Sequence, residues 1–250
     1  MCTIVFFVHN YLKMKNVSSI TTVSEQAFQA LRNDVLSGFH CSEAKLKIDA
    51  LQSLYGFSSS PLREALNRLA QEGLVKADER RGFRVAPISA EDLADITKMR
   101  LLIDLPALRE SIGAGGDAWE AEIVSSFHRL SKIESRLPEG PAVLDADWSQ
   151  HHRAFHCALI AACPSERQLS LSMSLFDQAE RYRQFSARNR RIPKRKDEEH
   201  NTLMKAVLNR EVDKALALLT QHIQSTQSNV LSALESKEKQ FNPSRLETAC

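Results

Sequence analysis

Apolar positions recur at helical spacing along most of the chain, and the N-terminal third shows this first. Ala27, Leu31 and Val35 repeat every four residues, which places them on one face of a helix. The segment Thr22-Val-Ser-Glu25 has the spacing of a capping box, and Gly38 follows the apolar face. Because a capping box marks a first helical turn and glycine commonly ends a helix, the pattern predicts a helix between Thr22 and Gly38.

Two further helices and a hairpin follow this helix. Leu62, Leu66 and Leu69 form an apolar stripe, and Pro61 stands at the expected first helical position, where its missing N–H costs nothing. Two β-prone runs come next, joined by a turn at 79–82. The expected ranges are 48–55 and 60–72 for the helices and 74–77 and 83–85 for the strands. This order of elements is typical of a winged helix-turn-helix.

The remaining two-thirds of the chain has helical periodicity and no strand pattern. The expected helices span 89–114, 119–137, 143–162, 166–187, 197–208 and 211–234. In the first of them, Leu93, Ile96, Met99, Leu102 and Ile103 are expected to face inward. The fold class is therefore mainly α, with a winged helix-turn-helix followed by an all-α bundle.

This organisation divides the chain into four parts. We expect a disordered or mis-assigned N-terminal extension with Met14 as the true start, then the winged helix-turn-helix, the bundle and a flexible polar tail. The corresponding ranges are 1–22, 23–88, 89–235 and 236–250.

Composition agrees with a helical protein and excludes several classes. The 250 residues include 8 Gly and 8 Pro, about half the usual share, which disfavours a β-sandwich and a disordered linker protein. No run of about 18 apolar residues occurs, so we expect no membrane span. The 5 Cys residues form no CxxC pair, which predicts free thiols in a reducing cytoplasm and a cytoplasmic protein.

Charge favours a polyanion as the partner of the N-terminal third. The net charge of the chain is +2, and residues 1–88 carry 11 Lys and Arg against 8 Asp and Glu. The third helix of such a domain enters the major groove of DNA with its N-terminal turn first. Serine hydroxyls suit phosphates, and arginines suit phosphates or guanine. The candidate contacts are Ser58, Ser59, Ser60, Arg63, Arg68, Arg80, Arg81 and Gly82. Alternatively, Arg63 and Arg68 only decorate a solvated helix face.

Four histidines form a candidate metal site. His152 and His156 are four residues apart, so they share one helical face at about 5–6 Å between Cβ atoms. His200 and His222 come from two later helices. The alternative is that these histidines only pack in the core or lie on the surface. A competing pair, Asp147 and His151, lies about 140° round the same helix, so both pairs cannot face one cavity.

The N-terminal third resembles the DNA-binding domain of the GntR family of transcriptional regulators. The matching segments are Leu31-Arg32, Ser58-Ser-Ser-Pro-Leu-Arg-Glu-Ala-Leu66, Glu72-Gly-Leu-Val75 and Arg81-Gly-Phe-Arg-Val85. The resemblance implies a protein that binds a short palindromic operator in double-stranded DNA as a homodimer. The family usually has an arginine that contacts DNA where this chain has Ser59, which implies a different operator.

The bundle resembles the FCD ligand-binding domain of the FadR subgroup of that family. The matching segments are Arg100-Leu-Leu-Ile-Asp104, Phe155-His156-Cys-Ala-Leu159, Glu199-His200 and His222. The resemblance implies a divalent metal held by His156, His200 and His222, with His152 where the family usually has Asp or Asn. An all-nitrogen set suits Zn or Ni better than Mn. It also implies a carboxylate effector bound with help from Arg100, although Arg100 could instead pair with Asp104.

Other segments of the bundle resemble the CsiR repressors, which implies repression relieved by glutarate or 2-hydroxyglutarate. The matching segments are Trp148 with His152-Arg-Ala-Phe-His156, Leu175-Phe-Asp177 with Arg181-Tyr-Arg183, and Glu199-His200 with Leu203-Met204. Arg181 and Arg183 then face either the effector cavity or solvent, and Arg183 is the candidate effector contact. Two alternatives stay open: a regulator of the same fold without metal, and a metal-dependent hydrolase using the histidines. The sequence lacks the HExxH pattern of the latter, because Arg153 follows His152. The basic run from Arg188 to Lys196 is expected to be a solvated loop.

Overall fold

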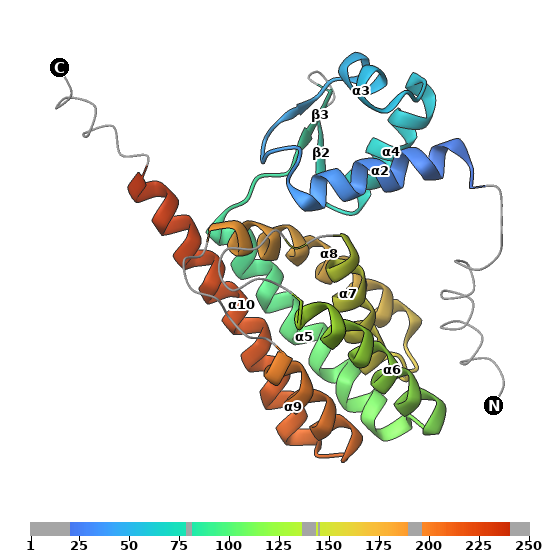
Figure 1. Cartoon of the computed structure of the whole chain (residues 1–250), viewed down its shortest axis with the longest axis vertical. Helices are drawn as coiled ribbons and strands as arrows, with labels where there is room; N and C mark the ends of the chain where they lie inside the picture. The colour runs from blue at the N-terminus through green and yellow to red at the C-terminus, as the bar shows by residue number, and fades with distance from the viewer. Residues whose placement is uncertain (1–20, 79–81, 137–143, 145, 190–196, 241–250) are drawn as a thin grey trace.

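The computed structural model describes residues 21–78, 82–136, 144, 146–189 and 197–240. A small N-terminal domain lies against one end of a helical bundle, and the chain passes once between them at residues 86–89 (Figure 1). Helix and strand content agrees with the predicted fold class, a winged helix-turn-helix followed by an all-α bundle.

Within the described residues, the N-terminal domain consists of three helices and a three-stranded antiparallel sheet with strand order β1-β3-β2. Its elements are α2 (Val23–Ser37), β1 (Lys45–Leu46), α3 (Ile48–Tyr55), α4 (Ser59–Gln71), β2 (Val75–Asp78) and β3 (Gly82–Val85). Leu31, Leu62, Leu66 and Leu69 have no exposed surface. The apolar stripes of α2 and α4 therefore form the core of this domain.

Local signals set the ends of α2. The Thr22 side chain accepts a hydrogen bond from the Glu25 backbone N–H at 3.2 Å, as predicted from the capping box. Gly38 ends the helix at a φ of 71°, a left-handed conformation that costs glycine little. The Glu25 carboxylate binds Arg68 in α4 at 2.8 Å, so the first turn of α2 is tied to α4.

Two details of this domain differ from the sequence prediction. Helix α4 begins at Ser59, with Ser58 as its N-cap, so Pro61 is the third helical residue and not the first. Proline is tolerated there because none of the first N–H groups of a helix has an intrahelical acceptor. Strand β1 was not predicted, because its two residues, paired with Arg84 and Phe83, are too few to show a period. The β2–β3 hairpin was predicted and is present.

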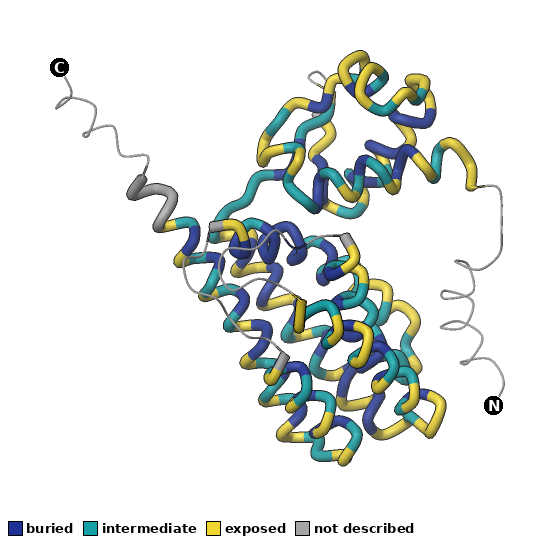
Figure 2. The backbone as a smooth tube through the Cα atoms, in the orientation of Figure 1, coloured by how far each residue is buried: buried dark blue, intermediate teal, exposed yellow. Residues whose placement is uncertain are grey.

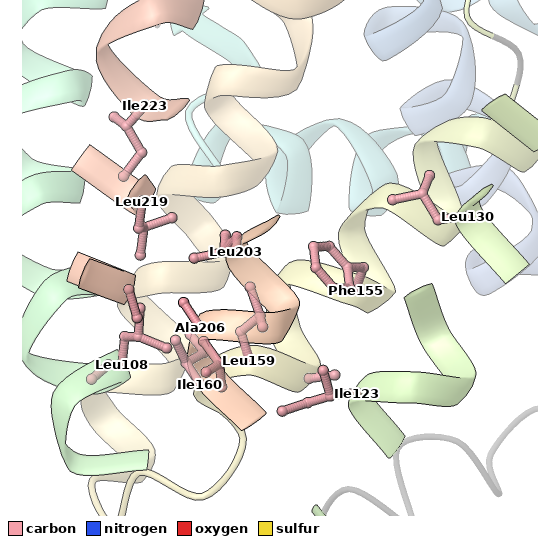
Figure 3. Close-up of a cluster of buried hydrophobic side chains, with 14 of the residues drawn as sticks. Leu108, Ile123, Leu130, Phe155, Leu159, Ile160, Leu203, Ala206, Leu219 and Ile223 are labelled. Carbon is pink, nitrogen blue, oxygen red and sulfur yellow. The ribbon is translucent and has the colours of Figure 1, made fainter. Parts of the chain in front are cut away.

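The bundle consists of six helices within the described residues. They are α5 (Ala90–Ala114), α6 (Asp117–Glu134), α7 (Ala146–Ile160), α8 (Glu166–Asn189), α9 (Asp197–Leu208) and α10 (Val212–Gln240). Figure 2 shows the buried positions on the inward faces of these helices. Leu108, Ile123, Phe155, Leu203 and Leu219 meet in the apolar core, each from a different helix (Figure 3).

Helix α10 continues through residue 240, whereas the sequence predicted its end at residue 234. The added segment, Glu235-Ser-Lys-Glu-Lys-Gln240, contains no apolar residue. Apolar periodicity therefore could not detect it, although Glu, Lys and Gln have good intrinsic helix propensity. The predicted flexible tail from residue 236 is thus helical as far as Gln240.

The inward face of α5 also differs from the prediction. Met99 and Leu102 are 38% and 58% exposed, whereas Arg100 and Asp104 are buried at 4% each. Helix α5 carries apolar residues on two sides, so periodicity alone could not select the buried side. The buried polar pair and the exposed apolar pair both bear on function.

Candidate functional site

The four candidate histidines converge inside the bundle. His152 and His156 project from α7, His200 from α9 and His222 from α10, and all four are buried. One ring nitrogen from each lies within 4.8 Å of one from each of the others. Four imidazoles from three helices at this separation form a candidate site for one divalent ion.

The competing pair on α7 lies elsewhere. Asp147 is exposed and His151 is half-buried, whereas His152 and His156 are 0% and 7% exposed. The rotation of about 100° per residue of an α-helix accounts for this separation. The family resemblance favoured His152 and His156 over Asp147 and His151, and in the structure His152 and His156 are the pair that faces the interior.

Two carboxylates orient rings of the cluster from outside. The Nδ1 atom of His200 lies 3.4 Å from Glu134 Oε2, and the Nδ1 atom of His222 lies 3.3 Å from Glu199 Oε2. A carboxylate at Nδ1 stabilises the tautomer with its proton there, which leaves Nε2 as the lone-pair donor to a metal. Sequence reasoning missed this role of Glu134 and Glu199, because a carboxylate partner contributed by another element leaves no local spacing signal.

The electrostatic environment of His156 also suits metal binding. Burial lowers the pKa of His156 well below its usual range, and the nearby His222, His200, Arg100 and Arg183 lower it further. The Nε2 atoms of His156 and His200 are buried and have no hydrogen-bond partner among the described residues. Neutral imidazoles with unused lone pairs are the form that binds metal ions. The residues present therefore fit a divalent metal.

A small cavity lies beside His156. Its polar lining comprises Arg100, Asp104, His156, Cys157 and Ser172. Its apolar lining comprises Leu159, Ile160, Met173, Phe176 and Leu219. About 20 Å³ is free, which is room for one or two water molecules.

Arg100 lines this cavity and also forms the predicted pair with Asp104. Its Nε and Nη2 atoms both lie 3.0 Å from Asp104 Oδ2. The Ser172 hydroxyl donates to the other carboxylate oxygen at 2.6 Å. The pairing alternative raised by the sequence is therefore present, and the same guanidinium also borders the cavity.

Arg183 and Arg181 lie outside the lining of this cavity. Arg183 is bound to Glu180 at 2.8 Å, donates to the Phe176 carbonyl at 2.9 Å, and lies 4.0 Å from the Phe176 ring centroid. Arg183 therefore contacts Phe176, which lines the cavity, without lining the cavity itself. Arg181 faces neither this cavity nor solvent, because it is buried and donates to the backbone carbonyl of Ala86.

The N-terminal turn of α4 is open to a partner. Ser58, Ser59, Ser60 and Arg63 are all exposed, and Ser58 makes no side-chain capping hydrogen bond. Free N–H groups at a helix N-terminus attract anions. Gly82 is exposed at the start of β3 with a φ of 83°, and Arg80 and Arg81 lie outside the described residues.

Arg68 has a different environment from Arg63. It lies in the last turn of α4, where it binds Glu25 at 2.8 Å. Its guanidinium carbon is 3.7 Å from the centroid of the Phe28 ring. Both the charge and the flat face of Arg68 thus have partners within the domain, and its DNA contact stays a prediction.

Helix α8 joins the two domains. Asp177 of α8 binds Arg153 of α7 at 2.7 Å and Arg32 of α2 at 2.6 Å. Arg32 also binds Glu72 of the N-terminal domain at 3.0 Å. Phe176, which directly precedes Asp177 in α8, packs against the rings of His152 and His156. One helix therefore borders both the histidine site and the domain junction.

Two protein-family models match the chain, one over the N-terminal domain and one over the bundle. Residues 23–85 match the model described as bacterial regulatory proteins, gntR family, and residues 95–225 match the FCD domain. Within the described residues, no helix is long and apolar enough to cross a membrane.

Two relatives match both domains. The chain is 37% identical over 214 residues to an uncharacterized HTH-type transcriptional regulator, BphR, of Paraburkholderia xenovorans (strain LB400), covering 86% of this chain and 87% of BphR. It is 36% identical over 208 residues to the HTH-type transcriptional repressor GlaR of Escherichia coli (strain K12), covering 82% of this chain and 94% of GlaR.

Among solved structures, the fold is similar to that of E. coli McbR/YncC. The TM-score is 0.69 at 17% sequence identity, over 89% of this chain and all of that one. A GntR regulator from Rhodococcus sp. RHA1 gives a TM-score of 0.67 at 18% identity, over 84% of this chain and 98% of that one.

These matches exclude the hydrolase alternative, since both domains are those of regulators. The chain belongs to the GntR family of transcriptional regulators, as a member with an FCD domain and no enzymatic role.

Proposed function

We propose that this regulator is a repressor that binds an operator as a homodimer and releases it when a small carboxylate enters the bundle. One observation supports the effector part of the proposal above all. The four-histidine cluster and Arg100 lie at the same cavity, which His156 and Arg100 both line. A guanidinium beside a metal site is suited to binding a carboxylate.

DNA is bound by the exposed N-terminal turn of α4. Ser58, Ser59 and Ser60 donate hydroxyls to phosphate oxygens, and Arg63 reaches a phosphate or a guanine edge. Arg80, Arg81 and Gly82 are proposed at the tip of the wing, next to a minor groove or the backbone. The name of the relative GlaR, a repressor, supports repression.

The metal is held by His152, His156, His200 and His222. A ligand set made only of imidazoles favours Zn or Ni over Mn, because imidazole is a softer ligand than carboxylate or water. When bound, the ion supplies a Lewis-acidic position for a carboxylate oxygen. Glu134 and Glu199 hold the rings of His200 and His222 in the binding tautomer.

The effector is a short dicarboxylate such as glutarate or 2-hydroxyglutarate. Arg100 binds one carboxylate from α5, while Phe176 forms an apolar wall from α8. Arg183 contributes indirectly, because it fixes the position of Phe176. Helix α8 also contacts α2 through Asp177 and Arg32. A ligand that moves Phe176 therefore changes how the DNA-binding domain packs against the bundle.

Dimerisation uses the uncovered side of the bundle. Met99 and Leu102 of α5 and Leu171 of α8 are large apolar side chains that are 38%, 58% and 54% exposed. Helices α5 and α8 pack side by side, since Asp104 bonds to Ser172 and Ile103 to Gln168. An apolar face of this kind is typical of a contact between subunits.

Fluorescence anisotropy on the regulator's own promoter fragment tests this proposal. We expect affinity that falls steeply with salt, and release by glutarate or 2-hydroxyglutarate from protein loaded with Zn. Chelator treatment should abolish the release. Release that persists after chelation would favour the metal-free regulator, with Arg100 as the main anchor. No release by any short carboxylate would contradict the effector class.

A further inference from the structure

We propose that Asp104 is an internal stand-in for the effector carboxylate at Arg100, and that it thereby sets which ligands the cavity accepts. The inference rests on the proposed function, because it assigns a partner to the anion site of that function.

The contacts of Asp104 imitate those of a bound acid. Arg100 directs two N–H groups, on Nε and Nη2, at Oδ2, and each distance is 3.0 Å. Ser172 donates to Oδ1 at 2.6 Å. The guanidinium thus already holds a carboxylate through the two-donor geometry that it would offer to a ligand.

The surroundings prevent a simple addition of a second carboxylate. The side chains of Arg100 and Asp104 are only 5% and 6% exposed, so their charges are poorly screened by water. The free space beside them is about 20 Å³, far below the size of a dicarboxylate. A ligand must therefore open the cavity, and its carboxylate must compete with Asp104 for Arg100.

Ser172 gives the displaced carboxylate an alternative. The serine lies on α8, whereas Arg100 and Asp104 lie on α5, so Asp104 can keep its hydrogen bond to Ser172 after losing Arg100. The competition has a consequence for selectivity. Only a ligand that supplies a full negative charge can replace Asp104, since a neutral ligand would leave Arg100 buried and unpaired.

Isothermal titration with glutarate tests the inference on full-length, Zn-loaded protein. We compare wild type with Asp104→Asn, which removes the competing charge and keeps the shape. The expected result is binding at least about fivefold tighter than wild type. Asp213→Asn is the matched control, because Asp213 forms an exposed ion pair with Arg109 at 3.4 Å and should leave affinity unchanged.

A second pair of variants isolates the competition. In an Arg100→Gln background, which removes the positive charge for which the two carboxylates compete, Asp104→Asn should change glutarate affinity less than twofold. Asp104→Ser provides a second uncharged variant if the asparagine protein is poorly folded, as judged by its melting temperature. It is expected to bind more tightly than wild type as well.

Three results would overturn the inference, and they differ from one another. If wild type binds glutarate and Asp104→Asn binds equally or more weakly, Asp104 only positions Arg100, and the proposed function survives. If Asp104→Asn is tighter by the same factor in the Arg100→Gln background, the competition does not involve Arg100. If neither protein binds any short dicarboxylate, the effector class fails together with the stand-in.

Discussion

Asp177 of α8 and Arg32 of α2 form an ion pair of 2.6 Å that joins the bundle to the DNA-binding domain. The carboxylate is shared, because Arg153 binds its other oxygen at 2.7 Å. Arg153 directly follows His152 in α7. Asp177 directly follows Phe176, whose ring packs against His152 and His156. The ion pair between the domains is therefore linked to the histidine site through both α7 and α8.

Asp177→Asn should loosen the junction while leaving the two cores intact. Asp177 is 8% exposed, and loss of one partner from a buried charge cluster costs on the order of 3 kcal/mol. We expect faster amide hydrogen exchange in α2 and in the middle of α8, with no change in α9. Asp213→Asn serves as the control. Equal exchange in both variants would show that the pair does not hold the domains together.

Arg63→Ala should weaken operator binding, with a salt dependence that identifies the contact. Arg63 is exposed near the N-terminal turn of α4. A lost phosphate contact reduces the slope of log K against log salt by about 1, whereas a lost guanine contact relaxes sequence preference at a cost of about 1–3 kcal/mol. Anisotropy at several salt concentrations measures both.

The control for this variant is Arg129→Ala, an exposed arginine on α6. It removes the same charge from the chain at a site far from α4 in the sequence. If both variants weakened binding equally, the effect would come from net charge, and the proposed reading helix would be wrong.

Glu134→Gln and Glu199→Gln should each weaken metal binding without removing a ligand. Each carboxylate faces the Nδ1 atom of a cluster histidine, at 3.4 and 3.3 Å. Loss of such an outer partner typically costs about 10–100-fold in metal affinity. Competition with a chromophoric chelator, using Zn as the probe, gives the affinity directly.

Glu166→Gln, on the exposed first turn of α8, is the matched control and should bind Zn like wild type. The role assigned to Glu134 and Glu199 would be refuted by unchanged Zn affinity in both variants. Chelator-resistant release of DNA, in contrast, concerns the effector mechanism and leaves this prediction unaffected.

The sequence predicted the histidine cluster but not the contacts between helices that support it. The i, i+4 spacing of His152 and His156 predicted a shared face, and the structure confirms that all four histidines meet. Spacing could not reveal Glu134, Ser172 or Asp177, because each acts on a residue from another helix. Contacts of this kind depend on how helices pack, and no single-sequence period encodes packing.

The same limit explains the errors on α5. Met99, Leu102, Leu93 and Ile96 all fit an apolar helical pattern, yet only Leu93 and Ile96 are buried. The inner face further along the helix is taken by Arg100 and Asp104, which are paired and therefore tolerate burial. A pattern that counts apolar residues places such a pair outside and its apolar neighbours inside, the reverse of what the structure shows.

This reversal leads to a prediction about assembly. If the exposed apolar side chains of α5 and α8 form the subunit contact, a charge placed there should split the dimer, because burying an unpaired carboxylate is strongly unfavourable. Leu102→Asp, at a residue that is 58% exposed, should therefore give a monomer by light scattering coupled to size exclusion. Its melting temperature at low protein concentration should stay near that of wild type, since the side chain contributes little to the fold of one subunit.

Val124→Asp, on α6 and 47% exposed, introduces the same charge at another exposed apolar residue and should remain dimeric. A dimer with Leu102→Asp and a monomer with Val124→Asp would move the interface to α6, and the operator affinity of each variant would then report which surface spaces the two reading helices.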